Sequence, residues 1–321
     1  MGKLGRKQKS SHRAAQKAVK REKVSEPQTP KRFLFGITEA QEDFSSRHQE
    51  MLNEYSKIRA AQDRAISGAT NRMKVMDDKV IYFLARQVFE DFDEILILCG
   101  NGLSTGALKI LRGMFERTVT ICYLQKHPEH IELYYKYYYV RRRKEIKAVL
   151  RDFPNSIPSE RLEEYEKQFE DVKERFQVPA CEVCKVEECL PCKRTRINHT
   201  WIRKDIVQMA REAGGFEPVI WIGYYVPMQE SHPTAQAIER RVKFNENDKW
   251  EYVEGARPET DQNTFVVAHF LILKAIDALG DHFNLELNLK ELFDAYVRII
   301  KNHAKERKQK SQLLKSSGTV L

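Results

Sequence analysis

Four cysteines within twelve residues carry the most specific chemistry in this sequence. They form two C-x-x-C pairs with a four-residue spacer: Cys181, Cys184, Cys189 and Cys192. Two such pairs can present four thiolates to one tetrahedral ion, and the basic residues beside them favour the thiolate form. We expect a structural Zn²⁺, since four thiolates leave no position open for a substrate. An iron–sulfur cluster, redox disulfides and unliganded thiols on a loop are the alternatives.

A charged pair lies within a strongly apolar helical pattern. Arg112 and Glu116 are four residues apart, so they share one face of a helix. Apolar residues surround them, which predicts partial burial, and charges removed from water need partners. The pair is therefore either a structural ion pair that orients two neighbouring helices or part of a functional site. In a site, Arg112 would bind a phosphate and Glu116 would orient the reacting groups.

The helix expected to follow that pair is rich in tyrosine and arginine. Tyr134, Tyr138 and Arg142 share one of its faces and could add hydroxyls and a further cation to the same site. Tyrosine rings stack on unpaired bases while arginine neutralises phosphate, which favours a nucleic-acid surface. The alternative is that one tyrosine stripe belongs to the core and the remainder forms a solvated face.

A histidine near the middle of the C-terminal half is the expected proton-transfer group. His232 precedes Pro233, and a residue before proline leaves helical geometry, so we expect the imidazole at a helix junction. Placed near Glu116, it could act as a general base or acid. A surface histidine without a catalytic role is the simpler interpretation.

The charge of the chain is unevenly distributed. The whole sequence has a net charge of +9, while residues 1–32 alone carry +9 and residues 298–321 carry +6. The segment between them is therefore acidic, at −6. Basic ends of this kind bind polyanions, and we expect nucleic acid, with RNA favoured, rather than a membrane. A tail that only aids solubility is the alternative.

The sequence predicts an all-α protein with a single helical bundle of seven to nine helices. Hydrophobic residues make up 41% of the chain, enough for a core, and the few glycines and prolines argue against an all-β fold. We expect helices over residues 38–67, 73–99, 104–126, 129–151, 159–177, 201–213, 264–284 and 289–309, and a hairpin over 241–255. We divide the chain into a disordered basic arm (1–32), a helical bundle domain (33–310) with an inserted cysteine knuckle (178–196), and a flexible tail (311–321). The longest apolar stretch, Thr264 to Leu273, is about half the length of a membrane helix.

Several short motifs resemble a bacterial, all-helical family of unknown function. The chain has Leu111-Arg112-Gly113-Met114-Phe115-Glu116 on an expected helix, a later Trp201, and Tyr225 followed by Ser231-His232-Pro233. The resemblance covers about residues 80–280 and implies an all-α domain in which Arg112, Glu116, Tyr225 and His232 converge in one pocket. It implies no established reaction. The basic arm and the cysteine segment depart from the family pattern.

Two Arg-x4-His spacings are similar to those of HEPN ribonucleases: Arg194 with His199, and Arg298 with His303. Neither arginine is followed by the Asn or Asp common in that family, so the analogy stays at the level of the fold. We expect a cytoplasmic, nucleic-acid-directed protein, such as an RNase-like effector of bacterial antiphage defence. A non-catalytic RNA-binding or scaffold module and a helical pocket for a small molecule are the alternatives, and self-association stays open.

Overall fold

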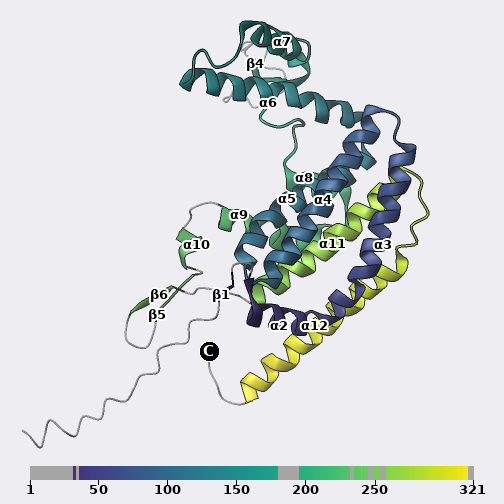
Figure 1. The fold of residues 1–321 in the computed structure, drawn as a ribbon, viewed down its shortest axis with the longest axis vertical. Helices are drawn as coiled ribbons and strands as arrows, with labels where there is room; N and C mark the ends of the chain where they lie inside the picture. The colour runs from purple at the N-terminus through teal and green to yellow at the C-terminus, as the bar shows by residue number, and fades with distance from the viewer. Residues whose placement is uncertain are drawn as a thin grey trace, which may run out of the picture.

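The computed structural model describes residues 32–33, 36–179, 195–231, 235–239, 241–244, 249–252 and 258–316, and these residues are mostly helical (Figure 1). The α-helices are α2 (Thr38–Arg47), α3 (Gln49–Arg72), α4 (Met76–Gly100), α5 (Ser104–Lys126), α6 (Ile131–Asp152), α7 (Ser159–Glu170), α8 (Ile206–Ala213), α9 (Val226–Ser231), α10 (Ala235–Glu239), α11 (Pro258–His282) and α12 (Lys290–Ser316). The described ranges thus hold about 11 helices, more than the seven to nine expected.

Three long helices form the centre of the bundle. α4, α5 and α11 lie side by side and make the most extensive contacts between elements (Figure 1). α5 is buried on nearly all sides, because apolar residues such as Leu111, Phe115, Val119 and Leu124 extend around it. Cys99 and Cys122 are buried in this cluster.

By length and composition, α11 could cross a membrane. Its segment Thr260–His282 has a mean hydropathy of 1.4, but 72% of its most apolar window is buried inside the protein. The central helix of a bundle has the same properties, since neighbouring helices and not lipid cover its apolar surface. The packing of α11 against both α4 and α5 accounts for its composition.

The first expected helix is broken in two. We predicted one helix over residues 38–67, but the chain turns at His48, between α2 and α3. His48 is buried, and its ring packs on Phe44 and lies 3.5 Å from Asp261 on α11. This contact with a distant helix is a tertiary feature that the local apolar pattern does not contain.

A small lobe lies beside the bundle. It consists of α6, α7, the 3₁₀-helix η2 (Lys173–Phe176) and the antiparallel strands β3 (Gln177–Pro179) and β4 (Thr195–Ile197). In Figure 1 the lobe lies at the top, and α6 connects it to the bundle through contacts with α4. It has its own hydrophobic cluster, formed by Tyr137, Val140, Phe169, Val172 and Phe176. Trp201 packs against both this cluster and the main core.

The region between α8 and α11 is built from short elements. After the 3₁₀-helix η3 (Glu217–Val219) comes a π-helix, η4 (Trp221–Tyr225), and then α9 and α10. The strands β5 (Val242–Phe244) and β6 (Trp250–Tyr252) pair antiparallel, which confirms the predicted hairpin. A second two-residue pairing joins β1 (Arg32–Phe33) to β2 (Gly36–Ile37).

The last helix is longer than expected. α12 continues to Ser316, where we predicted a flexible tail from residue 311. It packs against α3 and α11, and its end extends beyond the bundle (yellow in Figure 1). Apart from Arg32, the predicted basic arm lies outside the described residues.

Candidate functional site

Arg112 and Glu116 form an ion pair on α5. The Nε of Arg112 donates to Oε1 of Glu116 at 2.9 Å. The two side chains are 27% and 41% exposed, so the pair lies at the edge of the core. The guanidinium also lies over the ring of Tyr224, 5.3 Å from its centroid. Arg112 is therefore a reachable cation held between a carboxylate and an aromatic face.

The π-helix η4 brings Tyr224 to this cation. Gly223 lies against Phe115, and a Cβ at that glycine would be 2.8 Å from the Phe115 ring. The close approach places the Tyr224 ring 6.0 Å from Phe115, next to Arg112, and burial raises the pKa of Tyr224. Tyr225, which we expected in the site, packs against Trp221 and Tyr224 instead of directly on Arg112. The sequence resemblance drew attention to Tyr225 and missed Tyr224.

Tyr134, Tyr138 and Arg142 have different surroundings. The Tyr134 ring packs edge-on against Trp201, and burial raises the pKa of its hydroxyl. Tyr138 is exposed, and Arg142 lies over the Tyr165 ring of the small lobe. The spacing puts the three on one helix face, but Tyr134 contacts Trp201, Tyr138 contacts Tyr139 and Arg142 lies over Tyr165, so these contacts do not join them to the Arg112–Glu116 pair.

Two groups of predicted site residues lie outside the described residues. These are His232 and the four cysteines Cys181, Cys184, Cys189 and Cys192. The end of α9 at Ser231 directly precedes His232, and α9 packs against α5. The described residues therefore give no distance between the His232 imidazole and Arg112.

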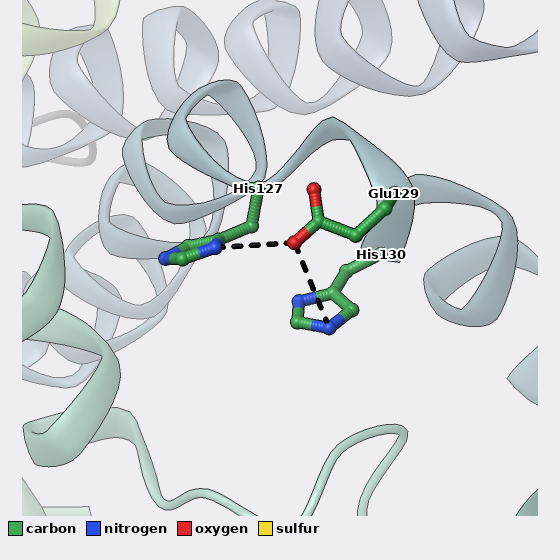
Figure 2. Close-up of side chains that lie close together, drawn as sticks. All are labelled: His127, Glu129 and His130. Carbon is green, nitrogen blue, oxygen red and sulfur yellow. Dashed lines mark hydrogen bonds and ion pairs between the residues drawn. The ribbon is translucent and has the colours of Figure 1, made fainter.

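A second cluster of ionisable side chains follows the end of α5. Figure 2 shows the carboxylate of Glu129 between the rings of His127 and His130. Its Oε1 lies 3.3 Å from Nδ1 of His127 and 4.0 Å from Nε2 of His130. The two rings are stacked, with centroids 5.6 Å apart. We did not predict this cluster.

The local sequence explains the geometry of this cluster. Pro128 ends α5 after Lys126 and begins the 3₁₀-helix η1 (Pro128–His130). Side chains three residues apart are eclipsed in a 3₁₀ turn, so His127 and His130 lie on one side. The segment His127-Pro128-Glu129-His130, at the boundary of the helices expected over 104–126 and 129–151, is the available sequence signal.

An outer group of residues surrounds the two histidines. The hydroxyl of buried Tyr123 lies 3.1 Å from Nδ1 of His130, and Oε2 of Glu212 lies 3.8 Å from Nε2 of His127. Lys204 joins these partners, since its Nζ donates to Glu212 at 2.5 Å and to Tyr123 at 3.3 Å. Each imidazole therefore has one nitrogen toward Glu129 and the other toward an outer partner.

The surroundings also shift the acidities of these groups. Burial lowers the pKa of His130, so its ring is neutral near pH 7. Burial raises the pKa of Tyr123, although its contact with Lys204 acts in the opposite direction. Hydrogen bonds from its own backbone N–H and from His127 lower the pKa of Glu129. The cluster thus combines a carboxylate with a neutral imidazole, groups that can transfer protons or bind a cation. Among the described residues, His127, Glu129 and His130 are the donor group close enough to share a metal ion.

Comparison with known proteins supports the resemblance seen in the sequence. A family model described as a family of unknown function (DUF5677) matches residues 78–249. Comparison with curated proteins gives no match, and comparison with solved structures gives none either. The matched range includes Arg112, Glu116, Tyr225 and the histidine cluster, and it excludes both basic ends. Because the model covers more than half of the chain, this protein belongs to the DUF5677 family.

Proposed function

We propose that this protein is directed to nucleic acid, with RNA as its ligand, and that the C-terminal helix provides the main phosphate contact. One observation carries the proposal: α12 continues as a single helix from Lys290 to Ser316, through the basic C-terminal segment. The cations of that segment are therefore held on one element that extends beyond the bundle (Figure 1).

The described cations of α12 share one face. Arg298, Lys301 and Lys305 are exposed, and spacings of three and four residues put them on the same side of a helix. The helix sequence continues with Arg307, Lys308, Lys310 and Lys315. A row of cations releases counterions from a phosphate backbone, so binding would be strong at low salt and weak at high salt.

A charge-reversal experiment tests the RNA proposal. Binding of single-stranded RNA to the full chain is measured by fluorescence anisotropy over a series of salt concentrations. We expect the triple variant Arg298→Glu, Lys301→Glu and Lys305→Glu to bind at least about tenfold more weakly, with a shallower salt dependence.

The matched control changes the same amount of charge elsewhere. Lys144, Lys147 and Arg151 are exposed on α6, and their triple replacement by Glu should change the affinity less than about threefold. Equal losses in the two triple variants, or no RNA binding by the wild-type chain, would contradict the proposal. Deletion of residues 1–32 measures the separate contribution of the basic arm.

A second candidate function is RNA cleavage at the Arg112–Glu116 pair. The half-exposed guanidinium over Tyr224 favours it, since a cation beside an aromatic face suits a phosphate next to a base. In this reaction the ribose 2′-oxygen attacks phosphorus while His232 takes its proton and Arg112 binds the phosphate. The bond to the 5′-oxygen breaks and water protonates that oxygen, which leaves a 2′,3′-cyclic phosphate and a 5′-hydroxyl.

Point variants test the cleavage proposal. Arg112→Gln and His232→Ala should each lower RNA cleavage by at least about a hundredfold, because one loses the phosphate ligand and the other the proton acceptor. Arg211→Gln, at an exposed arginine on α8, is the matched control and should cleave like the wild type. Equal rates in all four proteins would leave RNA binding without catalysis as the function.

We also propose a structural Zn²⁺ on Cys181, Cys184, Cys189 and Cys192. The neighbouring strands support it: β3 and β4 pair with Pro179 opposite Thr195, so the strand ends on the two sides of the cysteine segment lie opposite each other. Paired strands on both sides of the segment suit two C-x-x-C pairs that share one tetrahedral thiolate site. The double variant Cys181→Ser and Cys184→Ser should lose one zinc equivalent in elemental analysis. An unchanged metal content would contradict this site.

A further inference from the structure

We propose that His127, Glu129 and His130 form a binding site for a divalent transition-metal ion, separate from the cysteine segment and from the Arg112–Glu116 pair. Nδ1 of His127, a carboxylate oxygen of Glu129 and Nε2 of His130 would be the ligand atoms. The proposal does not depend on RNA binding. It rests on the placement of three donor atoms and of the residues behind them.

The donor atoms have nearly the spacing that a metal ion requires. All three lie within 4.8 Å of one another, and Oε1 of Glu129 is 3.3 Å from His127 and 4.0 Å from His130. Ligands about 2.0–2.2 Å from a tetrahedral zinc ion are about 3.3–3.6 Å apart. The first separation already fits, the second is about 0.4–0.7 Å too long, and the two imidazole nitrogens, which lie within 4.8 Å of each other, would also move together by side-chain rotation when an ion binds.

Each imidazole has an oxygen near its second ring nitrogen. Nδ1 of His130 faces the Tyr123 hydroxyl at 3.1 Å, and Nε2 of His127 faces the Glu212 carboxylate at 3.8 Å. Metal-binding histidines commonly donate their second N–H to a carboxylate or another oxygen, which fixes the tautomer and the ring orientation. Each ring of this cluster has an oxygen beside its second nitrogen, at 3.1 Å for His130 and 3.8 Å for His127, so the tautomer that binds an ion would have a partner for its N–H. The His130 ring would also turn, because the Glu129 carboxylate lies across it in Figure 2.

The nearby charges are compatible with a bound cation. Lys204 contacts the Tyr123 hydroxyl behind His130, and Glu212 pairs with this lysine at 2.5 Å. Lys126 donates to the backbone oxygen of Glu212. Glu129 supplies the negative charge of the donor set and is 62% exposed, while the histidines are 32% and 25% exposed. Two imidazoles and one carboxylate suit ions such as Zn²⁺, and three protein ligands leave positions for water or a substrate.

Zinc binding by the full chain tests the site. Protein stripped with a chelator is dialysed against Zn²⁺, and bound zinc is counted by elemental analysis. We expect Glu129→Gln and His130→Ala each to bind one zinc equivalent fewer than the wild type. The four cysteines are present in every variant, so whatever they bind cancels in the difference.

Two further variants keep the result interpretable. Glu163→Gln changes an exposed glutamate on α7 in the same way and should keep the full zinc content. Glu212→Gln removes only an outer partner, so we expect it to keep the equivalent but to weaken its affinity about tenfold. Circular dichroism checks that each variant is folded. Because the Glu129 side chain is exposed, Glu129→Gln should fold normally, so it tests the site even if His130→Ala unfolds. Equal zinc content and affinity in the wild type and Glu129→Gln would overturn the proposal.

Discussion

Arg47 on α2 and Asp261 on α11 form a two-bond ion pair across 214 residues of sequence. Nη1 and Nη2 of Arg47 donate to the two carboxylate oxygens at 2.7 and 2.8 Å. Asp261 is only 1% exposed. We expect Arg47→Met to lower the free energy of unfolding by about 3 kcal/mol, because the buried carboxylate loses its main partner. Urea unfolding measures this change.

The matched control for this pair is Arg151→Met. Arg151 contacts Asp152 at 3.0 Å, but both side chains are mostly exposed. An exposed pair contributes less than about 1 kcal/mol, so this variant should unfold nearly as the wild type does. Similar effects of the two methionine variants would show that the Arg47–Asp261 contact does not stabilise the junction of α2 and α11.

Two glycines should respond in opposite directions to the same substitution. A Cβ at Gly223 would lie 2.8 Å from Phe115 and 3.3 Å from Val267, whereas at Gly106 it would meet Leu98 at an ordinary 3.6 Å. Gly223→Ala should destabilise the protein by about 1–3 kcal/mol through overpacking. Gly106→Ala, on α5, should stabilise it by about 0.5–1 kcal/mol through helix propensity. Thermal and urea unfolding of both variants check the two signs.

His269 should make stability depend on pH. It is buried beside Phe92, Phe265 and Tyr296, and burial lowers its pKa from 6.5 to about 4. Between these values the unfolded chain takes up a proton and the folded protein does not. The free energy of unfolding should therefore fall as the pH decreases from about 6.5 to about 4, by as much as about 3 kcal/mol from this residue.

The variant His269→Phe isolates that contribution. Urea unfolding of both proteins at about pH 7.5 and pH 5 should show a loss about 2 kcal/mol smaller in the variant, because phenylalanine does not titrate. Other ionisable groups act equally in the two proteins and cancel. The same loss in both would mean that His269 does not resist protonation in the folded state.

Trp201 should couple the small lobe to the bundle. Its ring packs edge-on against Tyr123 of α5 and Tyr134 of α6, 5.9 and 5.3 Å away. We expect Trp201→Ala to raise amide hydrogen exchange in α7 by about tenfold or more while α4 and α11 stay protected. Trp221→Ala removes a mostly exposed tryptophan and should leave exchange in the lobe unchanged. Equal exchange in the two variants would contradict the coupling.

Much of the fold follows from local sequence patterns. The expected 104–126 helix is the observed α5, because an apolar run ends at a His-Pro step. The sequence pattern misses the break at His48, where the buried imidazole lies 3.5 Å from Asp261 on a remote helix, a contact that local periodicity does not contain. The lobe was missed for the same reason: the apolar residues of α6 and α7 have helical spacing whether they face the main core or one another.

The candidate site was only partly predictable. The four-residue spacing of Arg112 and Glu116 predicts their ion pair, since such residues share a helix face. The Tyr224 contact depends on the π-helix, which no periodic pattern indicates. The histidine cluster depends on a 3₁₀ turn and on Lys204 and Glu212, which are distant in sequence, so His127-Pro128-Glu129-His130 alone suggests only a helix end.

The helix α5 fixes the spacing between the two polar clusters. Arg112 lies eleven residues before Tyr123, about 16 Å along the axis, and the helix between them is buried. Inserting one residue there would rotate one cluster against the other by about 100° and turn core side chains toward solvent. Substitutions can therefore change the side chains of either cluster, but the number of residues between the clusters is fixed, because an insertion would disrupt the core packed around α5.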